Sequence, residues 1–176
     1  PYFRTKDSEA DLAASGIEMI CSRYANTNLD IPALPENLYR ITEDRDTKMI
    51  LDIGGDDSGA IVLGRLASAI LEENDYEMLT VINKYRPLTP DVESTVEVLR
   101  EIEASSRIPF TGIVNNSNLG EETTAEDVIA SVQYAEDVAS AMGIPVVMTT
   151  VKADLYEVLA GKIPNLFPLR LQKKIL

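Results

Sequence analysis

The sequence predicts an α/β fold with three layers, in which helices cover both faces of a mostly parallel sheet. Short apolar runs typical of buried strands alternate with longer segments whose apolar residues recur every three or four positions, as in amphipathic helices. Glycine, proline and asparagine occur mainly between these segments, where turns are expected. Strand followed by helix, repeated along a chain, is typical of a parallel sheet with helices packed on its faces.

Each element is predicted from its own local pattern. The run at residues 48–53 is almost wholly apolar, as expected for a strand covered on both faces. Helices begin at capping residues, such as Thr123 or Thr124, and end at glycines such as Gly143. The predicted elements, in chain order, are a helix at 7–15, a strand at 17–22, a loop at 23–35, a helix at 36–41, a strand at 48–53, a helix at 58–74, a strand at 77–83, a helix opened by Pro90 and Asp91, a strand at 110–115, a loop at 116–122, a helix that ends before Gly143, a strand at 145–150, a helix at 153–160 and a proline-punctuated tail at 163–176.

Composition excludes several classes of function. The 176 residues are predicted to form a single domain, and their net charge of −13 argues against nucleic acid and anionic membranes as partners. The longest apolar runs are far shorter than the roughly 20 residues that span a bilayer. Cys21 is the only cysteine and the chain has no histidine, which excludes an internal disulfide, Ser-His-Asp triads and the usual zinc sites. We therefore expect a cytoplasmic protein whose chemistry uses carboxylates, amides, hydroxyls, lysine, arginine or Mg²⁺.

A glycine turn after the strand at residues 48–53 is the first candidate site. Ligands of parallel sheets bind beyond the carboxyl ends of the strands, and Asp52 lies at such an end. Its carboxylate could hold a Mg²⁺-bound water or orient an attacking water. Gly54 and Gly55 would let backbone N–H groups approach a phosphate. In the structural alternative the glycines only form a turn, and Asp56 and Asp57 only cap the next helix.

Asparagines after the strand at residues 110–115 form the second candidate site. Asn115, Asn116 and Asn118 carry amides that can pair with both donor and acceptor edges of a purine base. Asparagine also tolerates left-handed backbone and caps turns with its own side chain, so an Asn-rich turn without a ligand is the alternative.

These two segments resemble the deviant-Walker P-loop ATPases, the family of MinD, ParA and the nitrogenase iron protein. Residues 51–55, LDIGG, resemble the Walker B and switch region of that family, and residues 112–116, GIVNN, resemble the strand that leads to its base-contacting Asn. Residues 1–4, PYFR, are similar to the end of a D-x-D-x-x-N-P-Y-F-R segment that follows the second strand in one branch. The resemblance implies a P-loop NTPase-like, Rossmann-like domain that is truncated at its N-terminus.

The resemblance also implies roles for the candidate residues. Asp52 would be the catalytic and metal-binding carboxylate, Gly54 and Gly55 the switch backbone, and Asn115 and Asn116 the base contacts, with ATP and Mg²⁺ as the cofactors of the parent family. No G-x-x-x-x-G-K-[ST] phosphate loop occurs in the 176 residues, so normal ATP hydrolysis by this chain alone is not expected. Loss of the family's first strand would leave an unpaired sheet edge, through which a homo-oligomer could form.

Two other functions remain open at this point. A non-catalytic Rossmann-like module would act through its surface and its oligomeric edge. A flavodoxin-like or response-regulator-like domain would use Asp52 as a phosphoacceptor at a strand end, although the usual partner carboxylates on an earlier strand are not evident.

Overall fold

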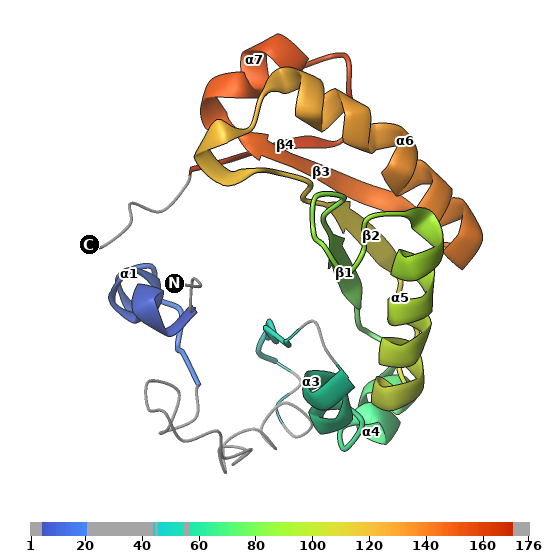
Figure 1. Ribbon diagram of the computed structural model, residues 1–176. Helices are drawn as coiled ribbons and strands as arrows, with labels where there is room; N and C mark the ends of the chain where they lie inside the picture. Colours follow the sequence, from blue (N-terminus) through green and yellow to red (C-terminus); the bar gives the residue numbers. More distant parts are fainter. Residues whose placement is uncertain (1–4, 21–43, 45, 55–56, 171–176) are drawn as a thin grey trace.

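Four short strands pair in parallel and form one sheet, with helices packed against it (Figure 1). The computed structural model describes residues 5–20, 44, 46–54 and 57–170. Their elements are η1 (Thr5–Ser8), α1 (Glu9–Ala14), α3 (Asp57–Leu63), α4 (Ala67–Glu73), β1 (Leu79–Ile82), α5 (Val92–Ser106), β2 (Gly112–Asn115), η3 (Gly120–Glu122), α6 (Ala125–Met142), β3 (Val146–Lys152), η4 (Ala153–Leu155), α7 (Tyr156–Leu159) and β4 (Leu166–Leu169). This architecture confirms the predicted α/β class and is consistent with a three-layer Rossmann-like fold.

The strands follow one another across the sheet in chain order, β1-β2-β3-β4. In the β1–β2 pair, Leu79 lies opposite Gly112 and Ile82 lies opposite Asn115. α5 connects β1 to β2, and α6 connects β2 to β3. Parallel crossovers are right-handed, so crossovers that all step in the same direction place their helices on one face of the sheet. Figure 1 shows α5, α6 and α7 along that face.

The main hydrophobic core lies between this face and the helices α5 and α6. Ile113 of β2 is fully buried there, in a cluster that also contains Leu99 of α5 and Val138 of α6. A second cluster joins α7 to the same face through Val151 of β3 and Leu159, which is also fully buried. Removal of these apolar side chains from water is the main force that holds the helices against the sheet.

The opposite face of the sheet carries exposed apolar side chains. Successive side chains of a strand point to opposite faces, so Leu79 and Val81 lie on the face away from buried Ile82. Leu79 is 40% exposed and Val81 is 62% exposed, whereas Ile82 is 3% exposed. Phe167 of β4 lies on the same face as Val81 and is 47% exposed. The described residues therefore leave this face partly uncovered.

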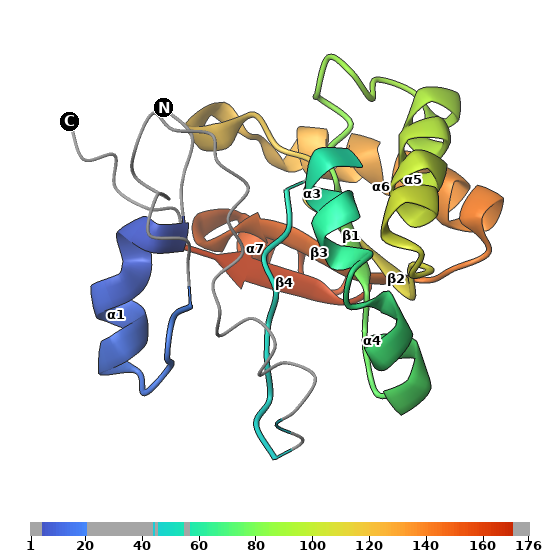
Figure 2. The same cartoon turned by 90° about the horizontal axis from the view of Figure 1, so that it is seen from below.

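Two short helices stand where one helix was predicted at residues 58–74. α3 ends at Leu63 and α4 begins at Ala67, with a turn at Gly64 between them. α3 packs beside α5, as both views show (Figure 1, Figure 2). Arg107, at the end of α5, donates a hydrogen bond from Nη2 to the carbonyl of Gly64. The break thus falls where the chain lies close to the end of α5, next to Ser105 and Arg107.

Two predicted strands are absent from the part of the chain that the structure describes. Residues 17–20 and 48–53 have no strand assignment, so the predictions of buried strands there are wrong. Ile17 is 52% exposed and Ile50 is 98% exposed. The physical reason is that a strand needs a hydrogen-bonded neighbour, and no described segment pairs with either run. The predicted loop at 23–35, the predicted helix at 36–41 and residues 21–22 lie outside the described residues.

The tail contributes a strand that the sequence reading missed. β4 pairs in parallel with β3 through Leu166–Leu169, a run interrupted by Pro168. Proline is tolerated on an edge strand, where its missing N–H costs no ladder bond. The prediction that residues 1–176 form a single domain stays a prediction.

The start of α5 and both ends of α6 match the capping that the sequence predicts, whereas Ser8 at the start of α1 makes no side-chain cap hydrogen bond. Asp91 caps α5 by accepting a hydrogen bond from the Ser94 N–H at 2.9 Å. Thr124 caps α6 in a capping box with Asp127, and Gly143 ends α6 with a φ of 71°.

Candidate functional site

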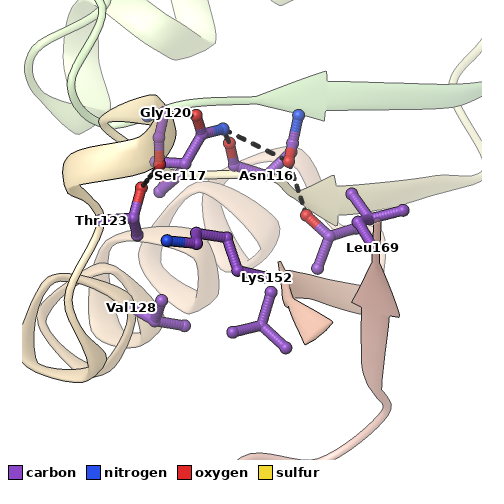
Figure 3. A pocket seen from close by; sticks show the side chains of 10 residues that line it. Asn116, Ser117, Gly120, Thr123, Val128, Lys152 and Leu169 are labelled. Carbon is purple, nitrogen blue, oxygen red and sulfur yellow. Dashed lines mark hydrogen bonds between the residues drawn. The ribbon is translucent and has the colours of Figure 1, made fainter. Parts of the chain in front are cut away.

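The loops that follow β1, β2 and β3 meet at the carboxyl edge of the sheet. This is the edge at which ligands bind in open α/β sheets. A small pocket lies there, with polar side chains on one side and apolar ones on the other (Figure 3). Its lining residues are Asn116, Ser117, Asn118, Gly120, Thr123, Val128, Thr150, Val151, Lys152 and Leu169.

Asn83 joins the loop after β1 to the loop after β2. Its Oδ1 accepts hydrogen bonds from the N–H groups of Tyr85, at 3.0 Å, and Asn118, at 3.2 Å. Its Nδ2 donates to the carbonyl of Asn118 at 3.3 Å. The Lys84 N–H also donates to Ser117 Oγ at 3.0 Å. The side chains of Asn83 and Ser117 thus pair with backbone N–H and C=O groups and hold the two loops together.

Asn115, one of the two predicted base contacts, is fully buried and internally bonded. Its Nδ2 donates to Ser131 Oγ on α6 at 3.0 Å, and its Oδ1 accepts from the Ser117 N–H at 3.2 Å. Strand alternation explains this position, because Asn115 shares the core face with Ile113. In this arrangement the amide of Asn115 secures the loop to α6. Its predicted role in base contact stays a prediction.

Asn116, the other predicted base contact, lies at the edge of the pocket and is partly exposed. Its Oδ1 accepts a hydrogen bond from Thr150 Oγ1 at 2.6 Å, and Asn118 Nδ2 lies 3.4 Å from the same oxygen. With Oδ1 turned toward these donors, Nδ2 points to the other side of the side chain, away from Lys152 (Figure 3). Within the described part of the chain, no hydrogen bond uses Nδ2 of Asn116. This donor is available to a ligand.

Lys152 borders the pocket at the end of β3 and secures the neighbouring turn. Its Nζ donates to the carbonyl of Glu121 at 3.0 Å and lies 3.7 Å from the Glu121 carboxylate. The carboxylate of Asp154 lies 3.6 Å from the same Nζ, and the Lys152 side chain is only 17% exposed. Sequence reading missed both Thr150 and Lys152. Their position at the end of an apolar strand is the signal that could have identified them.

Charge and burial at the nearby start of α6 alter two ionisation equilibria. Burial, followed by the negative charge of Asp127, raises the pKa of the Tyr85 hydroxyl, which donates to the Asp127 carbonyl at 2.8 Å. Hydrogen bonds from the hydroxyl and the N–H of Thr124 lower the pKa of the Asp127 carboxyl. Tyr85 is therefore a neutral donor at physiological pH, and Asp127 is ionised.

The other predicted site residues do not join this pocket. Asp52 is exposed and accepts a hydrogen bond from Thr5 Oγ1, and neither Asp52 nor Gly54 lines the pocket. Gly55 lies outside the described residues. The described part of the chain contains no group of three or more carboxylates or other common ligands that could hold a metal ion. Mg²⁺ is usually held by one or two carboxylates together with substrate phosphates, and a single exposed carboxylate without a phosphate cradle does not form such a site. The predicted metal role of Asp52 stays a prediction.

Comparisons with protein-family models, curated proteins and solved structures find no match to this chain. Among the described residues, no helix combines the length and the apolar character needed to cross a membrane.

Proposed function

We propose that this chain is the switch and base-recognition portion of a MinD/ParA-like ATP-binding protein and does not hydrolyse ATP by itself. The observation that carries the proposal is the orientation of Asn116 at the carboxyl edge of the sheet. Thr150 holds its amide so that Nδ2 is a fixed donor without a partner in the described residues. The single cysteine, Cys21, further suits a cytoplasmic protein.

A purine base suits this donor. Adenine presents ring-nitrogen acceptors, and asparagine amides pair with adenine through their Nδ2 and Oδ1 groups. The carbonyl oxygen of Asn116 has two lone pairs, of which Thr150 takes one at short distance. Asn116 can therefore donate to a base nitrogen while its carbonyl stays bonded to the protein.

Binding of the phosphates of a nucleotide by this chain has much weaker support than binding of the base. The sequence has no phosphate loop, and Asp52 does not line the pocket. A phosphate cradle and its lysine supply much of the binding in P-loop proteins. We therefore expect weak binding that depends on the base and changes little when phosphates or Mg²⁺ are added.

A titration followed by NMR tests this proposal. Adenosine, ATP and Mg²⁺-ATP are added separately to the full chain, and the side-chain amide signals of Asn116 are followed together with the backbone amide signals of Ser117 and Asn118, which remain in every variant. We expect all three ligands to shift these signals with dissociation constants on the order of 1 mM, as for a ligand that makes few polar contacts.

Asn116→Ala should weaken adenosine binding about tenfold or more, the value of one lost hydrogen bond that leaves a polar partner unsatisfied. Gln133→Ala on the exposed face of α6 is the matched control and should bind as the unchanged protein does. Tight binding that requires Mg²⁺ and survives Asn116→Ala would contradict the proposal.

The second candidate is a non-catalytic Rossmann-like interaction module, favoured by the uncovered face of the sheet. Val81 and Phe167 are 62% and 47% exposed on that face, and large exposed apolar patches often mark protein interfaces. Sedimentation velocity over a concentration series tests whether the chain self-associates. A sedimentation coefficient that stays at the monomer value would count against self-association.

A further inference from the structure

We infer that the free edge of β1 is a dimer interface, at which β1 pairs in antiparallel with β1 of a second copy of this chain and joins the two sheets into one. This inference goes beyond base recognition. It also differs from the interaction module considered above, which would use the uncovered face of the sheet rather than its edge. Three observations carry it: the unpaired main chain of β1, the absence of charge and proline from the strand, and the way the strand matches a second copy of itself.

The outer side of β1 carries main-chain groups that face no other described strand. The carbonyl of Ile82 accepts a hydrogen bond from the Asn116 N–H at 2.9 Å, so Ile82 and, two residues before it, Thr80 direct their main chain toward β2. By alternation, Leu79 and Val81 direct their N–H and C=O groups to the free edge. β1 is the last strand of the sheet in the described part of the chain (Figure 1). A row of such groups is a template for another strand.

β1 lacks the charges and prolines that usually protect an edge strand. Its residues, Leu79–Ile82, are all uncharged, whereas β4 at the opposite edge contains Pro168. Leu79 is 40% exposed and Val81 is 62% exposed. Pairing at this edge would therefore remove apolar surface from water in addition to forming main-chain hydrogen bonds.

The strand is complementary to itself when two copies are related by a two-fold axis beside Thr80. In antiparallel pairing about this axis, Leu79 lies opposite Val81 of the second copy, and Val81 lies opposite Leu79 of the second copy. Both residues face outward, so each pair exchanges both of its N–H···O bonds. Their apolar side chains then pack across the interface. Glu77 falls opposite Asn83 of the second copy, so no like charges meet. A two-fold interface requires this kind of self-complementarity.

The net charge of −13 limits the strength of the dimer. Two copies repel each other at long range, and the paired segment is short, so we expect weak association. Salt screens the repulsion between the copies but not the pairing of uncharged strands. Association should therefore be stronger at about 0.5 M salt than at about 0.05 M salt. Dissociation of the dimer by salt would overturn the inference, because it would show that ion pairs hold the copies together.

Sedimentation velocity and hydrogen exchange of the full chain, without nucleotide, test the dimer. We expect the sedimentation coefficient to rise between about 10 μM and about 1 mM protein. The amides of Leu79 and Val81 should exchange about threefold or more slowly at the highest concentration than at the lowest. The amides of Thr80 and Ile82 face β2, so they should exchange slowly at every concentration and report that the strand itself is folded.

Two variants of one residue test whether the edge is the interface. Val81→Lys places a charge on the paired strand and should weaken association about tenfold or more. Val81→Pro should have the same effect, because it removes an outward N–H that the pairing with β2 does not use. Phe167→Lys is the matched control, since it makes the same change of charge on the uncovered face of β4 and should leave association as in the unchanged protein.

Association that slows the outward amides of β1 and is weakened by both Val81 variants supports the inference. A sedimentation coefficient that stays at the monomer value would overturn it. Slow exchange of Leu79 and Val81 in a protein that stays monomeric would also overturn it, because the edge would then be covered within one chain. Association lost in Phe167→Lys but kept in Val81→Lys would place the interface on the face instead. None of these results depends on nucleotide, so failure of the dimer and failure of base recognition are distinguishable.

Discussion

The hydroxyl groups of Thr95 on α5 and Tyr134 on α6 lie 2.6 Å apart in the core beneath the sheet. Thr95 also contacts the carbonyl of Asp91 at 2.6 Å, and Tyr134 contacts the carbonyl of Thr89 at 3.2 Å. The pair therefore links two helices and the turn that precedes α5.

Tyr134→Phe should lower the free energy of unfolding by about 1 kcal/mol, because it removes one buried hydroxyl and leaves the Thr89 carbonyl without this donor. Chemical denaturation measures the change. Tyr156→Phe, at a half-buried tyrosine of α7, is the control and should change stability by less than about 0.5 kcal/mol. Equal effects of the two variants would show that the Thr95–Tyr134 pair contributes little.

Gly64→Ala should destabilise the contact between α3 and α5. A Cβ at this position would lie 2.9 Å from the Ser105 carbonyl oxygen, and backbone must move to accommodate it. We expect a loss of about 1–3 kcal/mol, the usual cost of overpacking. Ser68→Ala on the exposed surface of α4 is the control, and thermal unfolding followed by circular dichroism gives both values. An unchanged midpoint in Gly64→Ala would mean that α3 can move away from α5 at no cost.

Thr150→Val should weaken adenosine binding without removing Asn116. Valine keeps the shape of threonine but cannot donate to Asn116 Oδ1, so the amide loses the bond that orients it. The side-chain amide signals of Asn116 should shift in the free protein, and affinity should fall by roughly three- to tenfold, as for one neutral hydrogen bond. Unchanged signals and unchanged affinity would remove Thr150 from the site.

The capping carboxylates should make stability depend on pH at the acid end. Hydrogen bonds from Ser94 lower the pKa of Asp91, and those from Thr124 lower the pKa of Asp127. A carboxyl whose pKa is lower in the folded state stabilises the fold above its unfolded pKa of about 3.9 and loses this contribution as pH falls through the folded pKa.

The double variant Asp91→Asn and Asp127→Asn tests this pH dependence. Asparagine is also a good capping residue but does not titrate in this range. The melting temperature of the double variant should therefore fall less between about pH 5 and about pH 3 than the melting temperature of the unchanged protein. Parallel curves for the two proteins would contradict the assignment.

Local signals account for the parts of the fold that the sequence predicted well. α5 and α6 are defined by capping residues, a long amphipathic repeat and, for α6, a terminal glycine. Strand β2 was predicted because its apolar run is short and ends in an Asn-rich turn. These features act over a few residues and do not depend on the rest of the chain.

Features that depend on distant partners could not be predicted in this way. The run at residues 48–53 has the composition of a buried strand, but whether it pairs is decided by its neighbours in space. The sequence did not predict β4, because Pro168 argues against a strand unless that strand is known to lie at the edge of a sheet. At the site, adjacent asparagines differ because alternation turns Asn115 into the core and Asn116 toward Thr150.

The bonds among Asn83, Ser117 and Asn118 have a thermodynamic consequence for any ligand of this edge. Side chains rather than a bound molecule hold the two loops in place. Ordering a mobile loop on binding consumes part of the interaction free energy, and a rim that is already ordered avoids this cost. A ligand that contacts Asn116 therefore loses mainly its own conformational freedom, so even a single well-oriented amide can contribute measurable affinity.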